Sequence, residues 1–211
     1  MIDPGPGTPA APDAAPGAGR RHLTGLARDV LETLLLTLVI FVAMQAFVAR
    51  VYGVEMASME GTLEPGQRVV VDELTPRFGG YARGDIVVFQ PPAPWDQTLG
   101  GQPLIKRVIG VGGDTIMIRD GHVEVNGRML VEPYVFDGQP TDPSSGRSTW
   151  LVPEGELFVL GDHRQASADS RVFGTIPISR VIGRAWLRFL PFDTFGVLST
   201  PVYPDLSPAA K

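Results

Sequence analysis

The sequence predicts a mainly β protein in which antiparallel sheets follow one N-terminal transmembrane helix. A run of twenty mostly apolar residues lies near the N-terminus. Short β-branched runs separated by Gly, Pro and Asp fill the chain after it, which is typical of strands joined by turns. After residue 50, apolar residues do not recur at helical spacing over any long stretch, so we expect no long helix there.

The N-terminal region is predicted to contain a disordered tail, residues 1–29, and the transmembrane helix, residues 30–49. The first 19 residues include five Pro, four Gly and five Ala, a composition that buries too little apolar surface to fold. As a helix, the run 30–49 spans roughly 30 Å, about one hydrocarbon core. A buried globular helix or a cleaved secretory signal would also be apolar. The run, however, has a poor polar face and exceeds the usual length of a signal's apolar region.

Arginines flank the apolar run unequally. Arg20, Arg21 and Arg28 precede it, whereas only Arg50 follows closely. Positive charge favours the cytoplasmic side of a membrane. We therefore expect a single-pass protein of the cell (inner or cytoplasmic) membrane, in contact with the lipid bilayer. Its N-terminus would be cytoplasmic, and the chain after Arg50 would lie on the exported side.

The rest of the chain is expected to form one globular β unit. Its predicted strands are 68–72, 85–89, 105–111, 115–119, 123–125, 156–160 and 181–189. Asp120-Gly121 and Asn126-Gly127 are typical of tight hairpin turns, in which both residues need positive φ. We expect a main β domain built from 51–114 and 154–192, a β subdomain inserted at 115–153, and a C-terminal tail at 193–211.

Composition excludes several classes of function. The formal net charge of −5 provides no basic field for a phosphate backbone, so nucleic acid is not an expected partner. The chain has no Cys, which excludes disulfides, thiolate metal sites and a Cys nucleophile. Its histidines, at 22, 122 and 163, are too scattered for a zinc site. We expect no metal and no cofactor.

Three segments combine polar residues with glycines beside predicted strands. The first, 54–63, contains Ser58; in the second, 105–114, Lys106 interrupts an apolar strand; the third is 161–174. Taken singly, they also suit a turn serine, an edge-strand lysine that discourages aggregation, and a loop held by Asp–Arg pairs. Only the combination of the three segments suggests a catalytic site.

Taken in order, these segments resemble the sequence boxes of the signal peptidase I family. The likeness rests on Ser58-Met59, the strand Arg83-Gly-Asp-Ile-Val-Val-Phe89, Lys106-Arg107 leading to Gly112-Gly-Asp114, and Gly161-Asp-His-Arg-Gln-Ala-Ser-Ala-Asp-Ser-Arg171. It covers roughly residues 30–190. The resemblance implies a signal-peptidase-type antiparallel β domain, carried by 51–114 and 154–192, that acts as a serine endopeptidase.

The resemblance also assigns roles to side chains. Ser58 would be the nucleophile and Lys106 the general base, a variant of the Ser-His-Asp arrangement. A solvated lysine has a pKa near 10.4, so Lys106 must be desolvated to act as a base. Ser167 would hydrogen-bond the Lys106 amine. Asp169 and Arg171 would hold that loop through an ion pair.

The substrates implied by the resemblance are the signal peptides of exported pre-proteins, cut after small residues of the Ala-x-Ala type. Such substrates need two shallow apolar pockets beside the nucleophile, and an extended peptide would bind as an added strand. The positions that align with the family's pocket walls are Tyr52, Val54, Met59, Leu63, Val69, Val88, Leu104 and Ile105.

Three residues depart from the family pattern. Met56 replaces the Ser or Gly two residues before the nucleophile, so a side-chain donor to the oxyanion is missing and the backbone N–H of Ser58 is the expected one. Gly61 stands where Pro is usual and would loosen the turn. His163 stands where Asn is usual and permits a rival triad of Ser58, His163 and an Asp, either 162 or 169.

Two other functions remain open from the sequence. One is a membrane-tethered β domain that binds exported proteins without cutting them, which the departures at Met56 and Gly61 would suit. The other is a Ser–Lys peptidase dedicated to one substrate or to itself.

Overall fold

The computed structural model describes residues 28–41, 49–93, 95, 100–144, 146–203 and 206. The chain divides into two units, Met1–Ala46 and Phe47–Lys211, and each is described by itself. In the first unit the described residues form one exposed helix at 28–41. Within the described ranges, no helix has the length and apolar character needed to cross a membrane.

The remaining residues of the predicted transmembrane span, 42–48, lie outside the described residues, as do residues 1–27 of the predicted tail. The predicted C-terminal end of the helix is wrong, because Ala49 already belongs to strand β1 and lies opposite Asp72 of β2. Residues 49–53 pair with β2 as an antiparallel strand, so the chain is extended from Ala49 onward.

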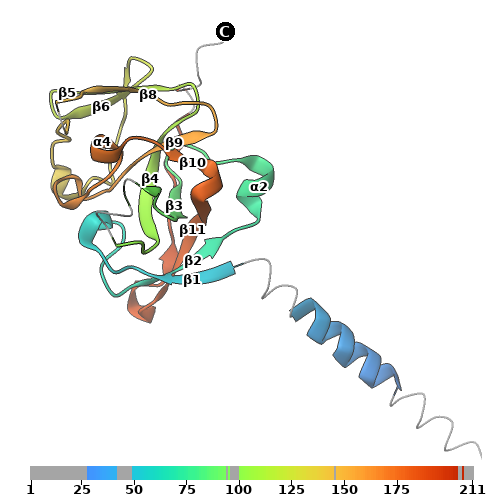
Figure 1. Ribbon diagram of the computed structural model, residues 1–211. Helices are drawn as coiled ribbons and strands as arrows, with labels where there is room; N and C mark the ends of the chain where they lie inside the picture. The colour runs from blue at the N-terminus through green and yellow to red at the C-terminus, as the bar shows by residue number, and fades with distance from the viewer. Residues whose placement is uncertain are drawn as a thin grey trace, which may run out of the picture. The chain divides into compact units, whose positions relative to one another are not determined.

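The second unit consists of short strands with a few single-turn helices (Figure 1). The elements are β1 (Ala49–Gly53), η1 (Ala57–Met59), β2 (Arg68–Asp72), α2 (Thr75–Gly79), β3 (Ile86–Phe89), β4 (Leu104–Val111), β5 (Thr115–Arg119), β6 (His122–Val125), β7 (Arg128–Met129), η2 (Phe136–Gly138), β8 (Thr149–Leu151), β9 (Glu156–Leu160), η3 (Arg164–Ala166), α4 (Ser170–Phe173), β10 (Ile176–Pro177), η4 (Ile178–Arg180), β11 (Val181–Leu190), η5 (Phe192–Thr194) and β12 (Gly196–Val197). The prediction of a mainly β protein is confirmed for these residues.

The larger sheet of the described chain has eight strands in the order β1-β2-β11-β3-β4-β9-β10, with β12 beside β11. Its strand pairs are antiparallel, as predicted. Strand β3 lies between β11 and β4, and its residues Ile86–Phe89 are all buried. A run of consecutive apolar residues suits such a central strand, because both of its faces are covered.

The smaller sheet follows β4 in sequence and has the order β7-β6-β5-β8 among the described strands. Asp120 and Gly121 join β5 to β6 with φ of 51° and 80°, and Asn126 and Gly127 join β6 to β7 with φ of 53° and 78°. Both predicted hairpin turns are confirmed. Positive φ at both turn residues explains the Asp-Gly and Asn-Gly pairs, since few other residues accept that conformation.

The segment expected to be a C-terminal tail contributes to the larger sheet. Strand β12 pairs with β11, and the N–H of Leu198 donates to the carbonyl of Trp186 at 2.8 Å. Leu198 is buried in a core cluster with Met59 and Leu63, and with residues of β2 and β3. This cluster lies beneath the turn that carries Ser58, so the end of the chain helps to support that turn.

Candidate active site

Ser58 lies in the single turn η1, which the chain enters from β1. Before the turn, Val54 is held in place: its N–H donates to Gln67 O at 2.8 Å and its carbonyl accepts from the Gly66 N–H at 2.8 Å. Met56 has extended backbone angles and ends this segment. Ser58 is 3% exposed, so its hydroxyl is held in a buried turn beside the sheet.

Lys106 lies on β4 opposite Val87 of β3. Its side chain is fully buried, and its Nζ is 2.5 Å from Ser58 Oγ. The two residues are 48 positions apart in the sequence. A nucleophile and a base at hydrogen-bond distance are the geometry that proton abstraction from a serine needs.

Burial lowers the pKa of Lys106 from the ordinary 10.5 to about 8. The cause is desolvation, which disfavours the ammonium form. The charges of Asp169 and Asp162 oppose this lowering, and the charge of Arg171 adds to it. At pH 7.5 an amine with a pKa of 8 is about one quarter neutral, compared with about one in a thousand for an ordinary lysine.

Each of the two carboxylates near Lys106 has its own arginine. Asp162 accepts from Arg107 Nε at 2.8 Å and from Arg107 Nη2 at 2.6 Å. Asp169 accepts from Arg171 Nε at 2.8 Å and from Arg171 Nη2 at 2.9 Å. All four side chains are buried. Because each negative charge is matched, the carboxylates only partly offset the effect of burial on Lys106.

Asp169 and Arg171 also organise the loop at 161–171. Asp169 Oδ1 accepts from the backbone N–H of Arg171, which starts the short helix α4. Arg171 Nη2 donates to the carbonyls of Arg164 and Ser167 at 2.6 and 3.2 Å. The ion pair expected from the sequence is therefore present, and it closes the loop on itself.

Ser167 differs from the expectation. Its Oγ is buried and has no hydrogen-bond partner among the described residues, so the expected hydrogen bond to the Lys106 amine is absent. The hydroxyl lies instead against Gly161, where an added Cβ would collide with Ser167 Oγ and with the carbonyl oxygen of Ser58. Only a glycine allows the loop to approach the nucleophile this closely.

A cleft of about 280 Å³ opens beside the two proposed catalytic residues. Five of the predicted pocket residues line it together with Ser58 and Lys106, namely Tyr52, Val54, Met59, Leu104 and Ile105. Glu55, Met56, Gln102 and Pro103 also contribute to its walls. One side of the cleft is formed by the end of β1 and the segment after it, and the other side by the start of β4 and the two residues before it.

Three of the predicted pocket residues do not line this cleft. Leu63, Val69 and Val88 have no solvent exposure and pack in the core cluster below it. Successive residues of a strand point to opposite faces. Val69 and Val88 lie on strands and face the core, and Leu63 lies in the loop after η1. Alignment with a family identifies the segment, but the packing decides which of its side chains reach the cleft.

The rival triad is not formed. The Nδ1 of His163 is 2.7 Å from Glu60 Oε2, and its ring lies against Phe136 with 4.5 Å between centroids. Asp162 bonds Arg107 and Thr62 instead of the His163 ring. The contact between His163 and Ser58 is between main-chain atoms, the His163 N–H donating to the Ser58 carbonyl at 3.1 Å. His163 therefore does not act as a base toward Ser58 in this geometry.

Gly61 is required by the backbone in this turn and does not merely loosen it. Its φ is 91°, and its N–H donates to Glu64 Oε1 at 3.2 Å. Proline has φ near −65° and no N–H, so it does not fit here. Met56, 41% exposed, lies on the cleft wall, and its side chain offers no N–H or O–H donor.

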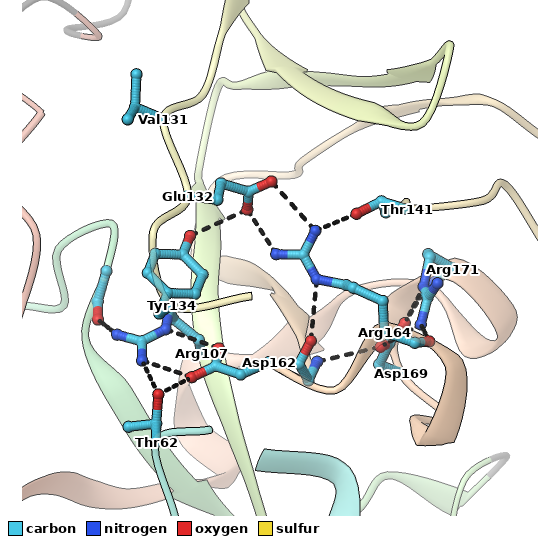
Figure 2. Close-up of polar contacts among 12 residues, drawn as sticks. Thr62, Arg107, Val131, Glu132, Tyr134, Thr141, Asp162, Arg164, Asp169 and Arg171 are labelled. Atoms are coloured by element: carbon cyan, nitrogen blue, oxygen red, sulfur yellow. Dashed lines mark hydrogen bonds and ion pairs between the residues drawn. The ribbon is translucent and has the colours of Figure 1, made fainter. Parts of the chain in front are cut away.

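The structure adds polar contacts that the sequence does not indicate. Arg107 stacks under Tyr134 with 3.9 Å to the ring centroid and donates to the carbonyl of Gly84 at 2.9 Å. Arg164 is buried and binds Glu132 (Figure 2). Tyr134 and Glu132 follow β7 of the smaller sheet, and no local sequence signal pairs them with the loop at 161–171.

Comparison with known proteins identifies the family. The family model described as signal peptidase, peptidase S26, matches residues 27–190. The chain belongs to this family. A signal peptidase I of Leptolyngbya laminosa is 35% identical over 92% of this chain and 95% of its own length. A signal peptidase I of Mycobacterium tuberculosis is 34% identical over 81% of this chain and 75% of its own length.

Two further proteins that are similar to this chain are also named signal peptidases. A signal peptidase IB of Staphylococcus aureus is 32% identical over 80% of this chain and 93% of its own length. A crystal structure of a signal peptidase I from Enterococcus faecalis covers 49% of this chain and 95% of its own chain, with 34% identity and a TM-score of 0.39. As a member of the S26 family, the chain is a peptidase, which makes the cleft beside Ser58 its candidate active site.

Proposed function

We propose that this S26 peptidase cleaves N-terminal signal peptides from exported pre-proteins, with Ser58 as nucleophile and Lys106 as general base. The observation that carries the proposal is the 2.5 Å distance between Lys106 Nζ and Ser58 Oγ, with the amine buried and its pKa lowered to about 8. Relatives named signal peptidase I, similar over most of the chain, support the substrate class.

The neutral Lys106 amine takes the proton of Ser58 as Oγ attacks the carbonyl carbon of the scissile bond. The resulting ammonium then gives that proton to the leaving amine as the C–N bond breaks, which leaves an acyl ester on Ser58. Water, deprotonated by the same amine, hydrolyses the ester. The backbone N–H of Ser58 is the proposed donor to the oxyanion, since Met56 supplies none.

The cleft supports a preference for small residues before the cut. At about 280 Å³ it lies at the small end of ligand pockets. Its walls include Val54, Leu104 and Ile105, which provide apolar contact for small side chains. We propose cleavage after Ala-x-Ala sequences, with the substrate extended beside the residues that follow β1.

The membrane anchor is part of the proposal. The apolar residues before β1, 30–48, preceded by three arginines and followed closely by Arg50, would hold the peptidase in the cytoplasmic membrane with its N-terminus inside. The β unit would then work on the exported side, and the sheet at 115–153 would be an insertion in its catalytic domain. Confinement with a membrane-tethered substrate raises the effective concentration of both.

A peptide cleavage assay tests the proposal. The detergent-solubilised full chain should cut an Ala-x-Ala peptide at a rate that rises with pH through an ionisation near pH 8. Ser58→Ala and Lys106→Met should abolish cleavage, whereas Ser179→Ala, which alters an exposed serine of η4, should not. Full activity of Lys106→Met would refute the assignment of the base.

A further inference from the structure

Glu132 lies in the segment after β7 and binds the loop that faces the nucleophile (Figure 2). Its two carboxylate oxygens accept from Arg164, at 2.6 Å from Nη2 and 3.1 Å from Nη1. The Arg164 side chain has no solvent exposure and that of Glu132 is 9% exposed. A forked arginine–carboxylate pair of this kind fixes direction as well as distance.

Further bonds hold both partners. Tyr134 donates its hydroxyl hydrogen to Glu132 Oε1 at 3.0 Å, and Arg164 Nη1 also donates to the hydroxyl of Thr141. The remaining guanidinium nitrogen of Arg164, Nε, donates to the carbonyl of Gly161 in its own loop at 3.0 Å. Glu132 and Thr141, 32 and 23 residues away in sequence, therefore hold the guanidinium that binds the Gly161 carbonyl.

Gly161 is the point at which this loop touches the nucleophile. It packs so closely against the Ser58 carbonyl that no Cβ fits, and its N–H donates to Asp169 Oδ2 at 3.1 Å. Two residues on, the His163 N–H donates to the same Ser58 carbonyl at 3.1 Å. Arg164, which holds the Gly161 carbonyl, therefore also affects the positions of Ser58 and Asp169. The charge of Asp169 acts on Lys106.

We propose that Glu132 is a positioning residue for the Ser58–Lys106 pair: it fixes Arg164, which holds the Gly161 carbonyl and with it the loop against the nucleophile. Glu132 itself touches neither reacting group. The kinetic test of this inference measures peptide cleavage and therefore rests on the proposed function. It gives the smaller sheet a part in catalysis, because the segment that leaves β7 carries the anchoring carboxylate.

Glu132→Gln is the first variant, since it keeps the shape and removes the charge. We expect kcat to fall at least tenfold with KM changed less than twofold, because a misplaced nucleophile affects the reaction more than substrate contact. The ionisation seen in the pH profile should also move above pH 8. A looser loop admits water to Lys106, and solvation restores the ammonium form. Glu132→Asp should be intermediate.

Two controls separate positioning from loss of fold. Glu124→Gln removes another glutamate of the smaller sheet that pairs with an arginine, Arg119 at 2.7 Å, and should leave cleavage and its pH profile unchanged. The double variant Glu132→Leu with Arg164→Met replaces the buried pair by apolar side chains, which is often neutral for stability. The Tyr134 and Thr141 hydroxyls and the Gly161 carbonyl lose a partner in it, so it should melt below the wild type. It should still be folded at the assay temperature and lose kcat.

A measurement without substrate distinguishes this inference from the proposed function. The chain has two lysines, Lys106 and Lys211, so 13C labelling at the lysine ε-carbon yields two resonances, which Lys211→Arg assigns. Glu132→Gln should raise the titration midpoint of Lys106. An unchanged midpoint in a folded variant would overturn the positioning role. Failure of the wild type to cut any Ala-x-Ala peptide would overturn the proposed function alone.

Discussion

Replacing Lys106 by Met is expected to abolish cleavage and, at neutral pH, to stabilise the folded protein. Burial lowers the pKa of this lysine from 10.5 to about 8. That difference corresponds to about 3 kcal/mol by which the fold disfavours the ammonium relative to the neutral amine. Methionine has a similar length and no charge, so the variant removes this unfavourable term from the folded state.

The sign of the effect follows from proton binding. Between pH 8 and pH 10.5 the unfolded chain binds a proton at Lys106 that the folded chain does not, so wild-type stability rises with pH in this window. The rise from pH 7 to pH 10 is about 2.5 kcal/mol. At pH 7 the variant gains about 3 kcal/mol and loses about 1 kcal/mol, because Ser58 Oγ loses its partner.

The net gain of about 2 kcal/mol at pH 7 corresponds to a rise in Tm of roughly 4–8 °C for a chain of this size. Urea unfolding of both proteins at pH 7 and pH 10 measures the effect, and the difference between them isolates Lys106 from other titrating groups. Ser58→Ala is the matched inactive control and should keep the pH dependence. An equal stability difference between Lys106→Met and wild type at both pH values would refute desolvation as the activating principle.

Three further substitutions test other parts of the site. Gly161→Ala places a Cβ against the Ser58 carbonyl, and we expect kcat to fall at least tenfold, measured by peptide cleavage. His163→Ala should retain cleavage within about threefold of wild type, because the ring does not contact the Ser58 hydroxyl; a loss as large as that of a catalytic variant would restore the rejected triad. Gly61→Pro should destabilise the fold by about 2 kcal/mol or more in urea unfolding, because φ of 91° is closed to proline and the N–H bond to Glu64 is lost.

Two matched controls accompany these glycine substitutions. Gly79→Ala adds a Cβ where no atom lies within 4 Å and the φ is not positive, so it should change neither activity nor stability. Gly66→Pro introduces proline at a second glycine with positive φ, 89°, whose N–H likewise donates a hydrogen bond, to the Val54 carbonyl at 2.8 Å. It should lose stability like Gly61→Pro, and a stable Gly66→Pro would show that positive φ alone does not explain the prediction.

Much of the fold is predictable from the chain because it depends on near neighbours. The apolar run at 86–89 indicates a strand, and Asn126-Gly127 indicates a tight turn, since both signals arise within a few residues. The boundary at Ala49 is mispredicted because an apolar residue suits a helix and a strand equally. Its pairing with Asp72, far along the chain, decides between them.

The candidate site also has a part that the sequence predicts and a part that it does not. Ser58 and Lys106 are predictable as residues because their sequence surroundings match a family. The burial of Leu63 and, among the described residues, the absence of a hydrogen-bond partner for Ser167 Oγ are not predictable, because both residues lie in loops whose packing depends on segments distant in the sequence. Glu132 is missed altogether, since its partner Arg164 lies in η3, 32 residues further along the chain, and no local pattern joins them.

The sequence by itself determined the antiparallel β character, the hairpin turns and the identity of the serine and lysine that are candidates for chemistry. The strands and turns depend on residue type and local spacing, whereas the serine and the lysine are singled out by the resemblance to a family. Only the tertiary structure decided that the Lys106 amine lies 2.5 Å from Ser58 Oγ with its pKa lowered to about 8. Desolvation depends on the atoms that surround the amine, and in this protein those atoms come from segments widely separated in the chain.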